Sequence, residues 1–403
     1  MSANMHLAIV TPFPPAITGI GQYGYHITQA LAQAGAFSSI TVLTSRHDTG
    51  GEAAPLPGVA VEQVWDADRA GAGVRIAARL RRLRPDLVWF NLGTTAFGCM
   101  ALANVSGLLA PLLAQRLGLP TVVTMHEVPQ LADLSRLRAP GGRLSAPGAV
   151  WATWAMTQAD VVCVTLARYA DWLSAHWPGR RYLHIPIGVY GEPQWQDEPP
   201  EPGLLYFTMP APFRGLEVLL QAYRILQQRR PDVRLTVAGA EHPRFPGYAT
   251  RVQQQFRDVT GVRWLGYVPE ARVQEIFKQT QVVVVPYVAA TGASSVLFQA
   301  VMRGRAVVLS DLPELRATVA DAGLQAEFFS SGDAPALAAV LDRILCQPKH
   351  RAQQVRWNQQ AIRRLQPDNT CRSYLHAFNL ALQTRCTLHR LSVPHDMTAE
   401  TVW

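Results

Sequence analysis

A loop of small polar residues follows a run of four valines late in the chain. Residues 291–295 read Thr-Gly-Ala-Ser-Ser, and a segment of helical length comes next. Where a buried strand ends in such a turn and a helix begins, backbone N–H groups and the positive end of the helix dipole can bind an anion. A serine N-cap with small packing residues is the alternative, and it would explain the serine but not the whole cluster. We therefore predict a phosphate contact at Gly292, Ala293, Ser294 and Ser295, with Gln299 reaching a ribose hydroxyl.

A second candidate site lies where Arg214 and Gly215 precede a long helical pattern. A guanidinium is a permanent cation, and beside the free N–H groups of a helix start it suits a diphosphate. We predict that Arg214 binds this diphosphate. A solvated surface arginine is the alternative.

Gly19, Gly21 and Gly24 formally match the G-x-G-x-x-G pattern of dinucleotide-binding turns. In that turn the glycines follow the strand directly and an acidic residue ends the second strand. Here seven residues intervene after Thr11, and the second strand ends in Leu43-Thr-Ser-Arg-His. An NAD-dependent oxidoreductase is therefore disfavoured. We predict instead that Gly19 and Gly21 let a helix N-terminus approach a phosphate or sugar, and a tight turn alone is the alternative.

His126 directly follows the predicted strand 121–125, at the end of the strand that faces a ligand crevice in an α/β fold. There it could donate a hydrogen bond to a sugar hydroxyl or to a developing charge, although a structural histidine is the alternative. The segment that follows contains several Arg, Gly and Pro residues. It is predicted to be an acceptor-binding or gating loop that begins at Glu127 and carries Trp151 and Trp154, whose rings can stack on sugars or pack in a core.

The amino-acid composition limits the kinds of fold and the kinds of partner that can go with these loops. The chain has 403 residues, of which 48% are hydrophobic and 16% charged, below the roughly 25% charged residues of an average soluble domain. A largely disordered chain is excluded. The net charge of +8 favours anionic partners such as phosphorylated substrates, anionic lipid or nucleic acid, but no basic run with interleaved aromatics supports nucleic acid.

The five cysteines are scattered, without a C-x-x-C pair or a histidine at metal-ligand spacing. We expect no metal site, no cleavable secretory signal and a reduced cytoplasmic protein. The stretch 95–114 is uncharged and long enough to span a bilayer. Because it contains glycines and a proline, we favour a buried helix and loop.

Short apolar runs alternate with amphipathic segments of helical length, which predicts an α/β fold with two doubly wound, Rossmann-like domains. The predicted strands are 7–11, 40–43, 87–90, 121–125, 161–164 and 182–185 in the first half, and 204–208, 234–238, 262–265, 282–286, 306–310 and 324–328 in the second. A segment rich in Pro and Glu separates the halves. The predicted organisation is a first domain 1–190, a linker 191–203, a second domain 204–370, a final helix 371–385 and a poorly ordered tail 386–403.

Residues 74–84 predict a basic amphipathic helix in the first domain. Arg75, Arg79 and Arg82 form a stripe beside an apolar one. Such a helix suits attachment to an anionic membrane, here the inner face, where lipid-linked acceptors reside. An ordinary solvated helix is the alternative.

Several segments in order along residues 5–383 now point to a family. They are Ile9-Val-Thr-Pro-Phe-Pro-Pro, Gly19-Ile-Gly21, Thr124-Met-His126-Glu127, Ile185-Pro-Ile-Gly-Val189, Arg214-Gly-Leu, Val237-Ala-Gly239, Leu265-Gly-Tyr-Val268, Val285-Pro286 and Gly304-Arg-Ala-Val-Val-Leu-Ser-Asp311. Each is loose alone, but their order and spacing are specific. The chain resembles the retaining GT-B glycosyltransferases, specifically glycosyltransferase family 4.

This resemblance implies transfer of a hexose from a nucleotide diphosphate sugar, a UDP- or GDP-sugar, with retention at the anomeric carbon. No metal and no further cofactor take part, and the acceptor is a glycan or lipid-linked molecule, as in cell-surface polysaccharide biosynthesis. It implies a GT-B fold in which two domains face a central cleft and a final helix returns to the first domain. Gly19 and Gly21 would then face the diphosphate and sugar, His126 the reaction centre, and Arg214 would replace the family's phosphate-binding lysine.

Departures from the family pattern fall at the same loops. Members usually carry Glu-x7-Glu where this chain has Thr291 and Gln299, and an arginine where it has Met209. Gln299 keeps hydrogen-bonding capacity without the charge that strengthens such bonds, and Thr291 is shorter than a glutamate. Our first hypothesis is that the protein is an active transferase in which Thr291 and His126 both take part in catalysis. A catalytically degenerate nucleotide-sugar-binding protein, or a partner subunit of a transferase, is the alternative.

Overall fold

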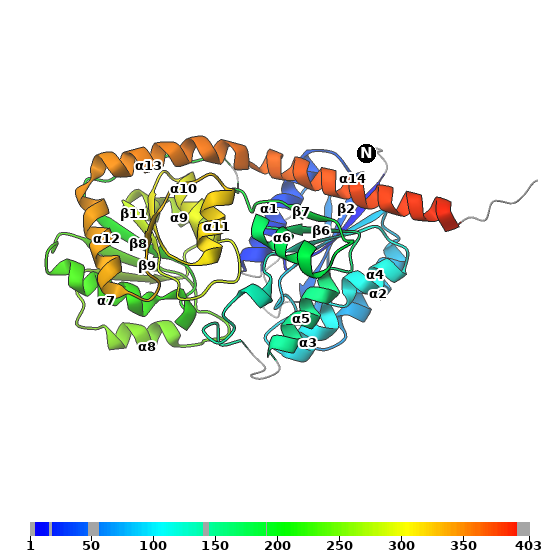
Figure 1. The fold of residues 1–403 in the computed structure, drawn as a ribbon, viewed down its shortest axis with the longest axis horizontal. Coiled ribbons are helices and arrows are strands. Elements are labelled where there is room, and N and C mark those ends of the chain that lie inside the picture. Colours follow the sequence, from blue (N-terminus) through cyan, green and yellow to red (C-terminus); the bar gives the residue numbers. More distant parts are fainter. Residues whose placement is uncertain (1–4, 16–17, 47–55, 140–144, 191, 393–403) are drawn as a thin grey trace, which may run out of the picture.

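Two α/β domains lie side by side, and the last two helices run along one edge of both (Figure 1). The structure is a computed structural model that describes residues 5–15, 18–46, 56–139, 145–190 and 192–392.

The first domain is built on one seven-stranded parallel sheet with the strand order β3-β2-β1-β4-β5-β6-β7. Its strands are β1 (His6–Val10), β2 (Ser39–Arg46), β3 (Val59–Asp66), β4 (Leu87–Leu92), β5 (Thr121–Met125), β6 (Val161–Val164) and β7 (Tyr182–His184). Its helices are α1 (Gly19–Gln33), α2 (Ala72–Leu83), α3 (Ala101–Gly107), α4 (Ala110–Arg116), η1 (Pro129–Leu131), α5 (Ser145–Met156) and α6 (Ala167–His176).

The second domain has a six-stranded parallel sheet with the order β10-β9-β8-β11-β12-β13. Its strands are β8 (Gly203–Phe207), β9 (Arg234–Ala238), β10 (Val262–Gly266), β11 (Val282–Val285), β12 (Ala306–Ser310) and β13 (Glu327–Phe329). Its helices are η3 (Pro212–Arg214), α7 (Leu216–Gln227), α8 (Tyr248–Gln255), α9 (Glu270–Lys278), α10 (Ser295–Met302), α11 (Pro313–Asp321), α12 (Ala334–Cys346), α13 (Pro348–Ala361) and η4 (Ile362–Leu365), followed by the crossover helix α14 (Pro367–Ser392).

The central strands are buried on both faces, which is why they read as continuous apolar runs. In β11 all four valines are buried, and β4, β5, β6 and β12 are buried throughout. Helices cover both faces of such a parallel sheet. The two sheets predicted from the sequence are confirmed.

Strand β3 was not predicted. It is the edge strand of the first sheet, and of its residues only Trp65 is buried. Its other side chains are partly or fully exposed, and polar residues such as Glu62 and Gln63 are tolerated there. For this reason the strand has no long apolar run. The pattern that predicts a buried strand is therefore absent.

Helix α14 returns to the first domain as expected, but its bounds differ from the prediction. It begins at Pro367 rather than 371 and continues to Ser392, past 385. Of the predicted tail, residues 393–403 lie outside the described residues.

The uncharged stretch 95–114 is divided between two short helices, α3 and α4. In the part of the chain that the structure describes, no helix is both long and apolar enough to cross a membrane.

Candidate functional site

The loops after β5 and β11 meet between the two domains. A Cβ added at Gly292 would lie 2.2 Å from the carbonyl oxygen of His126, so glycine is needed for this approach. The hydroxyl of Tyr169, on α6, donates to the carbonyl oxygen of Thr291 over 2.6 Å. Two segments that the sequence placed in one cleft, 126–127 and 291–295, are thus in contact.

A cavity of about 340 Å³ lies between the start of α1 and the second domain. Of the residues predicted to bind the donor, Gly19 and Gln299 line this cavity, whereas Gly21, Arg214 and residues 292–295 are not among its lining residues. Its other lining residues are Thr18, Gln22, Phe207, Thr208, Met209, Ala238, Gly239, Ala240, Tyr267, Val268, Glu270 and Val273. We call it the donor cavity.

Arg214 lies at the end of η3, in the loop after β8, and has no anionic partner in the described part of the chain. Its guanidinium carbon lies 4.3 Å from the centre of the Tyr287 ring, and its buried Nε has no hydrogen-bond partner among the described residues. The hydroxyl of Ser294, the N-cap residue of α10, is also buried and unpartnered. Buried polar groups are almost always hydrogen-bonded. Because β8 and β11 are neighbours in the sheet, these two groups lie on loops that follow adjacent strands.

The turn that carries Arg214 depends on Gly215, whose φ is +67°. A Cβ there would lie 1.7 Å from the carbonyl oxygen of Pro286. The loop after β8 can therefore pack directly on the loop after β11 only with glycine at this position.

The two glycines at the start of α1 have different surroundings. A Cβ at Gly19 would meet nothing within 4 Å, consistent with its place on the donor cavity. A Cβ at Gly21 would instead lie 2.8 Å from Thr18 Oγ1, and the Gly21 N–H donates to that oxygen over 2.9 Å. The predicted ligand contact of Gly21 is not supported, because its N–H is used by the N-cap Thr18.

His126 is held in a defined orientation by Asn91, at the end of β4. Asn91 Nδ2 donates to Thr11 Oγ1 over 2.9 Å and to the carbonyl oxygen of Ile20 over 3.1 Å. Its Oδ1 therefore faces the His126 ring, and Nε2 of His126 donates to it over 2.6 Å. With the proton on Nε2, neutral His126 offers Nδ1 as an acceptor. The sequence-based prediction of a donating histidine is thus corrected, since its N–H is already used.

The surroundings of His126 keep its imidazole neutral. Burial lowers its pKa to about 4. The edge of Tyr23 packs against the ring, with the ring centres 5.1 Å apart. The Tyr23 hydroxyl lies 2.7 Å from that of Tyr374 on α14, which in turn lies 2.9 Å from Thr124 Oγ1. The crossover helix thereby takes part in supporting the His126 loop.

Gln299 is also oriented by a neighbour. Nη1 of Arg303 donates to its Oε1 over 2.5 Å, and Arg303 is buried above the ring of Phe277. Burial lowers the pKa of Arg303. Since the Gln299 oxygen is bound to this cation, its amide NH₂ is the part left to meet a hydroxyl in the donor cavity.

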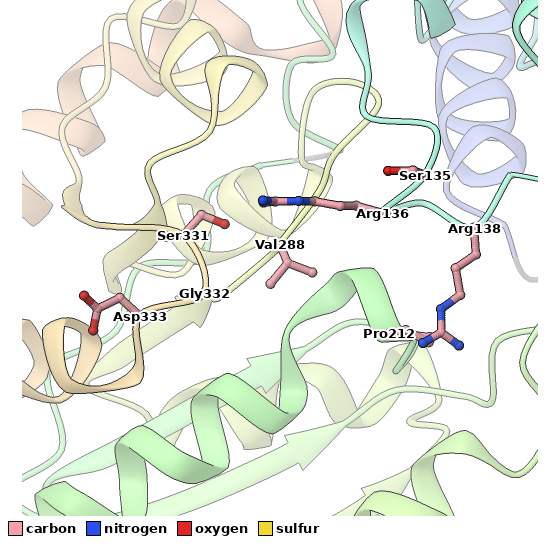
Figure 2. Close-up of a pocket in the computed structure, with 8 residues that line it drawn as sticks. All are labelled: Ser135, Arg136, Arg138, Pro212, Val288, Ser331, Gly332 and Asp333. Carbon is pink, nitrogen blue, oxygen red and sulfur yellow. The ribbon is translucent and has the colours of Figure 1, made fainter.

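A second cavity, of about 590 Å³, lies between the loop after β5 and the second domain (Figure 2). Arg136 and Arg138 project into it from the first domain, and Arg136 points toward Ser331 across the cavity. Arg136 Nε also lies 3.3 Å from Asp133 Oδ2. The remaining lining residues are Ser135, Pro212, Val288, Gly332 and Asp333. We call it the basic cavity.

The loop that carries these arginines is fastened to the second domain. Arg244 donates to the carbonyl oxygens of Leu137, over 3.2 Å, and Arg138. Leu137 also packs in a small apolar cluster with Ala211, Phe213 and Ala289. The segment predicted as an acceptor or gating loop thus bridges the two domains.

Of the three weaker acceptor residues, Glu127 is engaged within the first domain, and the two tryptophans lie away from the contact of the two domains. Glu127 Oε1 accepts from the N–H of Thr94, over 2.8 Å, and from its hydroxyl, so it joins two loops of the first domain. Trp151 and Trp154 line a shallow apolar hollow with Pro147, Val150 and Trp177. Both tryptophans belong to helix α5, which begins at Ser145 and packs on the outside of the first domain. The prediction that they lie in the cleft is therefore corrected.

The arginine stripe on α2 is partly neutralised. Arg79 pairs with Glu62 on β3 over 2.5 Å, and Arg75 donates to the carbonyl oxygen of Ala70 and lies 4.0 Å from Asp66. Arg82 is exposed. The apolar stripe of this helix, Ile76 and Leu80, is buried in the core.

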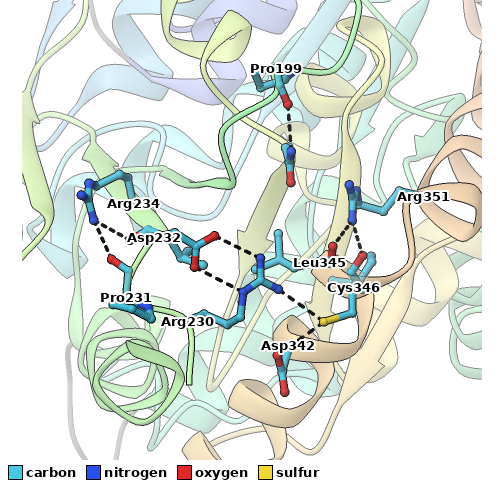
Figure 3. Close-up of polar contacts among 12 residues, drawn as sticks. Pro199, Arg230, Pro231, Asp232, Arg234, Asp342, Leu345, Cys346 and Arg351 are labelled. Carbon is cyan, nitrogen blue, oxygen red and sulfur yellow. Dashed lines mark hydrogen bonds and ion pairs between the residues drawn. The ribbon is translucent and has the colours of Figure 1, made fainter. Parts of the chain in front are cut away.

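The linker is tied to the second domain by carbonyl contacts. Gln281 Nε2 donates to the carbonyl oxygen of Pro199 over 2.8 Å (Figure 3). Arg305 donates to the carbonyl oxygens of Gln196 and Asp197, and Arg351 Nε lies 2.5 Å from Glu198. The described residues of the linker therefore belong to the second domain structurally.

Sequence reasoning missed Asn91, Arg303 and Tyr374. Asn91 directly follows the predicted strand 87–90, as His126 follows the predicted strand 121–125, so the rule that identified His126 could have identified it. Arg303 lies four residues after Gln299, one helical turn, but a buried arginine is rare enough not to be expected. Tyr374 has no local signal, since its role depends on where the crossover helix docks.

Comparisons with known proteins agree with this geometry. Residues 18–188 match the model of the glycosyl transferase 4-like domain, and residues 201–347 match that of the glycosyl transferases group 1. A phosphatidyl-myo-inositol mannosyltransferase of Mycolicibacterium smegmatis is 32% identical over 142 residues. That match spans 35% of this chain and 35% of the length of the mannosyltransferase.

Solved structures match over nearly the whole chain at low identity. Sucrose-phosphate synthase from Thermosynechococcus elongatus has a TM-score of 0.66 at 16% identity, covering 96% of this chain and 99% of its own. Anabaena HepE in complex with UDP-glucose has a TM-score of 0.65 at 15% identity, covering 95% and 100%. An α,α-trehalose 6-phosphate synthase from Burkholderia multivorans reaches 0.68 at 14% identity, covering 97% and 99%.

The domain matches and the structural matches lead to the same result. The chain has the GT-B fold, with its first domain similar to the glycosyl transferase 4-like domain and its second similar to the glycosyl transferases group 1 domain.

Proposed function

We propose that this protein is a retaining, metal-independent hexosyltransferase that uses a UDP- or GDP-sugar as donor. The observation that carries the proposal is the pair of buried, unpartnered groups, Arg214 Nε and Ser294 Oγ, on the loops that follow the neighbouring strands β8 and β11. A diphosphate supplies the acceptors that both groups lack. Relatives support a nucleotide-sugar donor, because HepE has been solved with UDP and with UDP-glucose.

Each side chain has a defined task in this scheme. The bond between the anomeric carbon and the diphosphate oxygen breaks, the acceptor oxygen bonds to the same face of that carbon, and the acceptor proton passes to the departing diphosphate oxygen. Arg214 and the N-terminus of α10, residues 292–295, stabilise the negative charge that develops on the diphosphate. His126 accepts a hydroxyl of the transferred sugar at Nδ1, and Thr291, without a carboxylate, contributes mainly through its backbone. Gln299 donates its amide NH₂ to the ribose.

The acceptor is proposed to enter from the basic cavity. Arg136 and Arg138 suit a glycan or lipid-linked acceptor that carries a phosphate or carboxylate. We place the reaction in the cytoplasm at the inner face of the membrane, in the assembly of a cell-surface polysaccharide.

A second candidate is a nucleotide-sugar-binding protein without transfer activity. It is favoured by Thr291 and Gln299, which replace the two glutamates usual at these positions, and by Arg303, which occupies the Gln299 oxygen. Donor binding is expected in both cases. Only the hexosyltransferase releases UDP or GDP.

A thermal-shift screen against UDP-, GDP- and ADP-sugars tests binding, and release of the nucleoside diphosphate tests turnover. Arg214→Ala should weaken donor binding by about tenfold to a hundredfold, as expected for a lost hydrogen bond to a charged group. Arg229→Ala, at an exposed arginine after α7, is the matched control and should bind normally. If neither wild type nor control is stabilised by any sugar nucleotide, the proposal fails. If binding occurs without nucleotide release across the panel, the second candidate is favoured.

A further inference from the structure

The outer helical layer of the first domain exposes an unusual share of apolar side chains. Of the eleven exposed large hydrophobic residues in the described part of the chain, seven lie on or directly beside α2, α3, α4 and α5. They are Val74, Met100, Leu102, Val105, Leu117, Val150 and Trp154. Soluble proteins expose such residues singly, and their concentration on one layer indicates an interaction surface.

These residues share one side of the molecule. Helices α2, α4 and α5 cover the same face of the first sheet, since they contribute Ile76, Ala110 and Ala155 to one core. Helix α2 packs beside α3 and α4, and α4 packs beside α5. Figure 1 shows the four helices gathered on the side of the first domain away from α14. We call this the outer layer.

The tips of the outer layer are formed by α3 and α5. Leu102 is 66% exposed and Met100 is 58% exposed, at the start of α3. On α5, Trp154 is 37% exposed and lines the apolar hollow with Trp151 and Trp177. Tryptophan is enriched where one end of a ring is apolar and the other wet, as at the boundary of a bilayer.

The charges of the outer layer have one sign. Helix α2 carries four arginines and α4 one, while α3 and α5 carry no charge, and none of the four helices contains Asp or Glu. Arg81 and Arg82 are exposed on α2. Acidic residues at the border are already engaged: Glu62 pairs with Arg79, Asp66 with Arg46 and Arg75, and Asp68 accepts the N–H of Cys99 and Met100.

From this combination we infer that the outer layer docks on an anionic lipid bilayer, with α3 and α5 inserting their apolar tips and α2 holding the phosphates of the headgroups. Exposed apolar side chains with adjacent unopposed arginines match the boundary of an anionic membrane, where both kinds of group are favoured. Helix α2 itself does not insert, because its apolar stripe is buried in the core. This inference rests on the proposed function, because docking on the membrane brings a lipid-linked acceptor to the first domain.

Co-sedimentation of the full chain tests it, using vesicles of phosphatidylglycerol and phosphatidylcholine against vesicles of phosphatidylcholine alone, without sugar nucleotide. Wild type should bind the anionic vesicles and be released by salt, because surface charge attraction is screened. The variant Arg81→Gln/Arg82→Gln should bind them about tenfold less tightly or worse. Met100→Ser/Leu102→Ser/Trp154→Ser should lose binding to a similar or greater degree.

Matched controls lie in the second domain. Arg229→Gln/Arg257→Gln and Trp195→Ser/Trp357→Ser change exposed arginines and tryptophans away from the outer layer and should bind as wild type does. Equal loss in test and control variants, equal binding to neutral vesicles, or dimerisation of wild type through this layer would each overturn the inference. Donor binding is measured separately by thermal shift, so failure on vesicles and failure of the proposed function are distinguishable.

Discussion

The two walls of the cleft satisfy their polar groups in different ways. In the first domain, Asn91 binds Thr11, Ile20 and His126, and Glu127 binds Thr94, so each of these side chains has a protein partner. In the second domain, Arg214 Nε and Ser294 Oγ are buried without one. Leaving such groups unpaired costs free energy, about 1–3 kcal/mol each. The difference indicates that the first wall is organised in advance, whereas the second is completed by its ligand.

The first way to test this comparison is through pH, where the expected effect is largest. The pKa of His126 is lowered from 6.5 to about 4 by burial, so between these values the unfolded chain binds a proton that the folded chain does not. Stability should therefore fall as the pH is lowered from 6.5 toward 4, by up to about 3 kcal/mol from this residue. His242, whose pKa is lowered to about 4 by burial and by Arg214 and Arg244, adds in the same direction.

Denaturant unfolding at pH 7, 6, 5 and 4.5 measures this slope. His126→Asn should flatten it, whatever the variant's stability at pH 7, and His376→Asn at an exposed position serves as the control. An unchanged slope in His126→Asn would contradict the description of His126 as a neutral, preorganised group.

Asn91→Ala tests the organisation of the first wall directly. It removes the acceptor of the His126 Nε2–H, so the ring loses the bond that sets its tautomer. We expect turnover to fall by about tenfold to a hundredfold, because a buried donor is left unpaired, while donor affinity stays close to wild type. Comparing kcat with the donor KM separates the two effects.

Thr94→Ala, on the neighbouring loop, is the control for general damage to this wall. It should lower stability without the same loss in kcat. If Asn91→Ala weakens donor binding as much as turnover, the two walls do not divide their roles as proposed.

The difference between the walls also explains what the sequence could predict. Strand ends and small-residue turns follow from local patterns, so the sequence could single out His126 and residues 292–295, which the fold brings into contact. Partnerships across the fold have no local signal: the Asn91 to His126 bond joins β4 to β5, and Tyr374 reaches Tyr23 from α14. Trp151 and Trp154 were misplaced because nothing in a stretch of Gly, Pro and Arg marks where α5 begins.

Ser294→Ala gives the smallest expected effect and tests the second wall. In the free protein the Ser294 hydroxyl has no partner among the described residues, so its removal should leave stability unchanged or slightly raised. With a diphosphate bound, the same hydroxyl donates a hydrogen bond, and its loss should weaken donor binding by about 1 kcal/mol, roughly fivefold.

Ser310→Ala is the contrasting variant, because that buried hydroxyl already donates to the carbonyl oxygen of Val285. Its replacement should lower stability and leave donor affinity unchanged. Melting temperatures with and without a UDP-sugar measure the stability of the free protein and its affinity for the donor. A Ser294→Ala protein that is less stable without ligand would show that the Ser294 hydroxyl already has a partner in the free protein, as the polar groups of the first wall do.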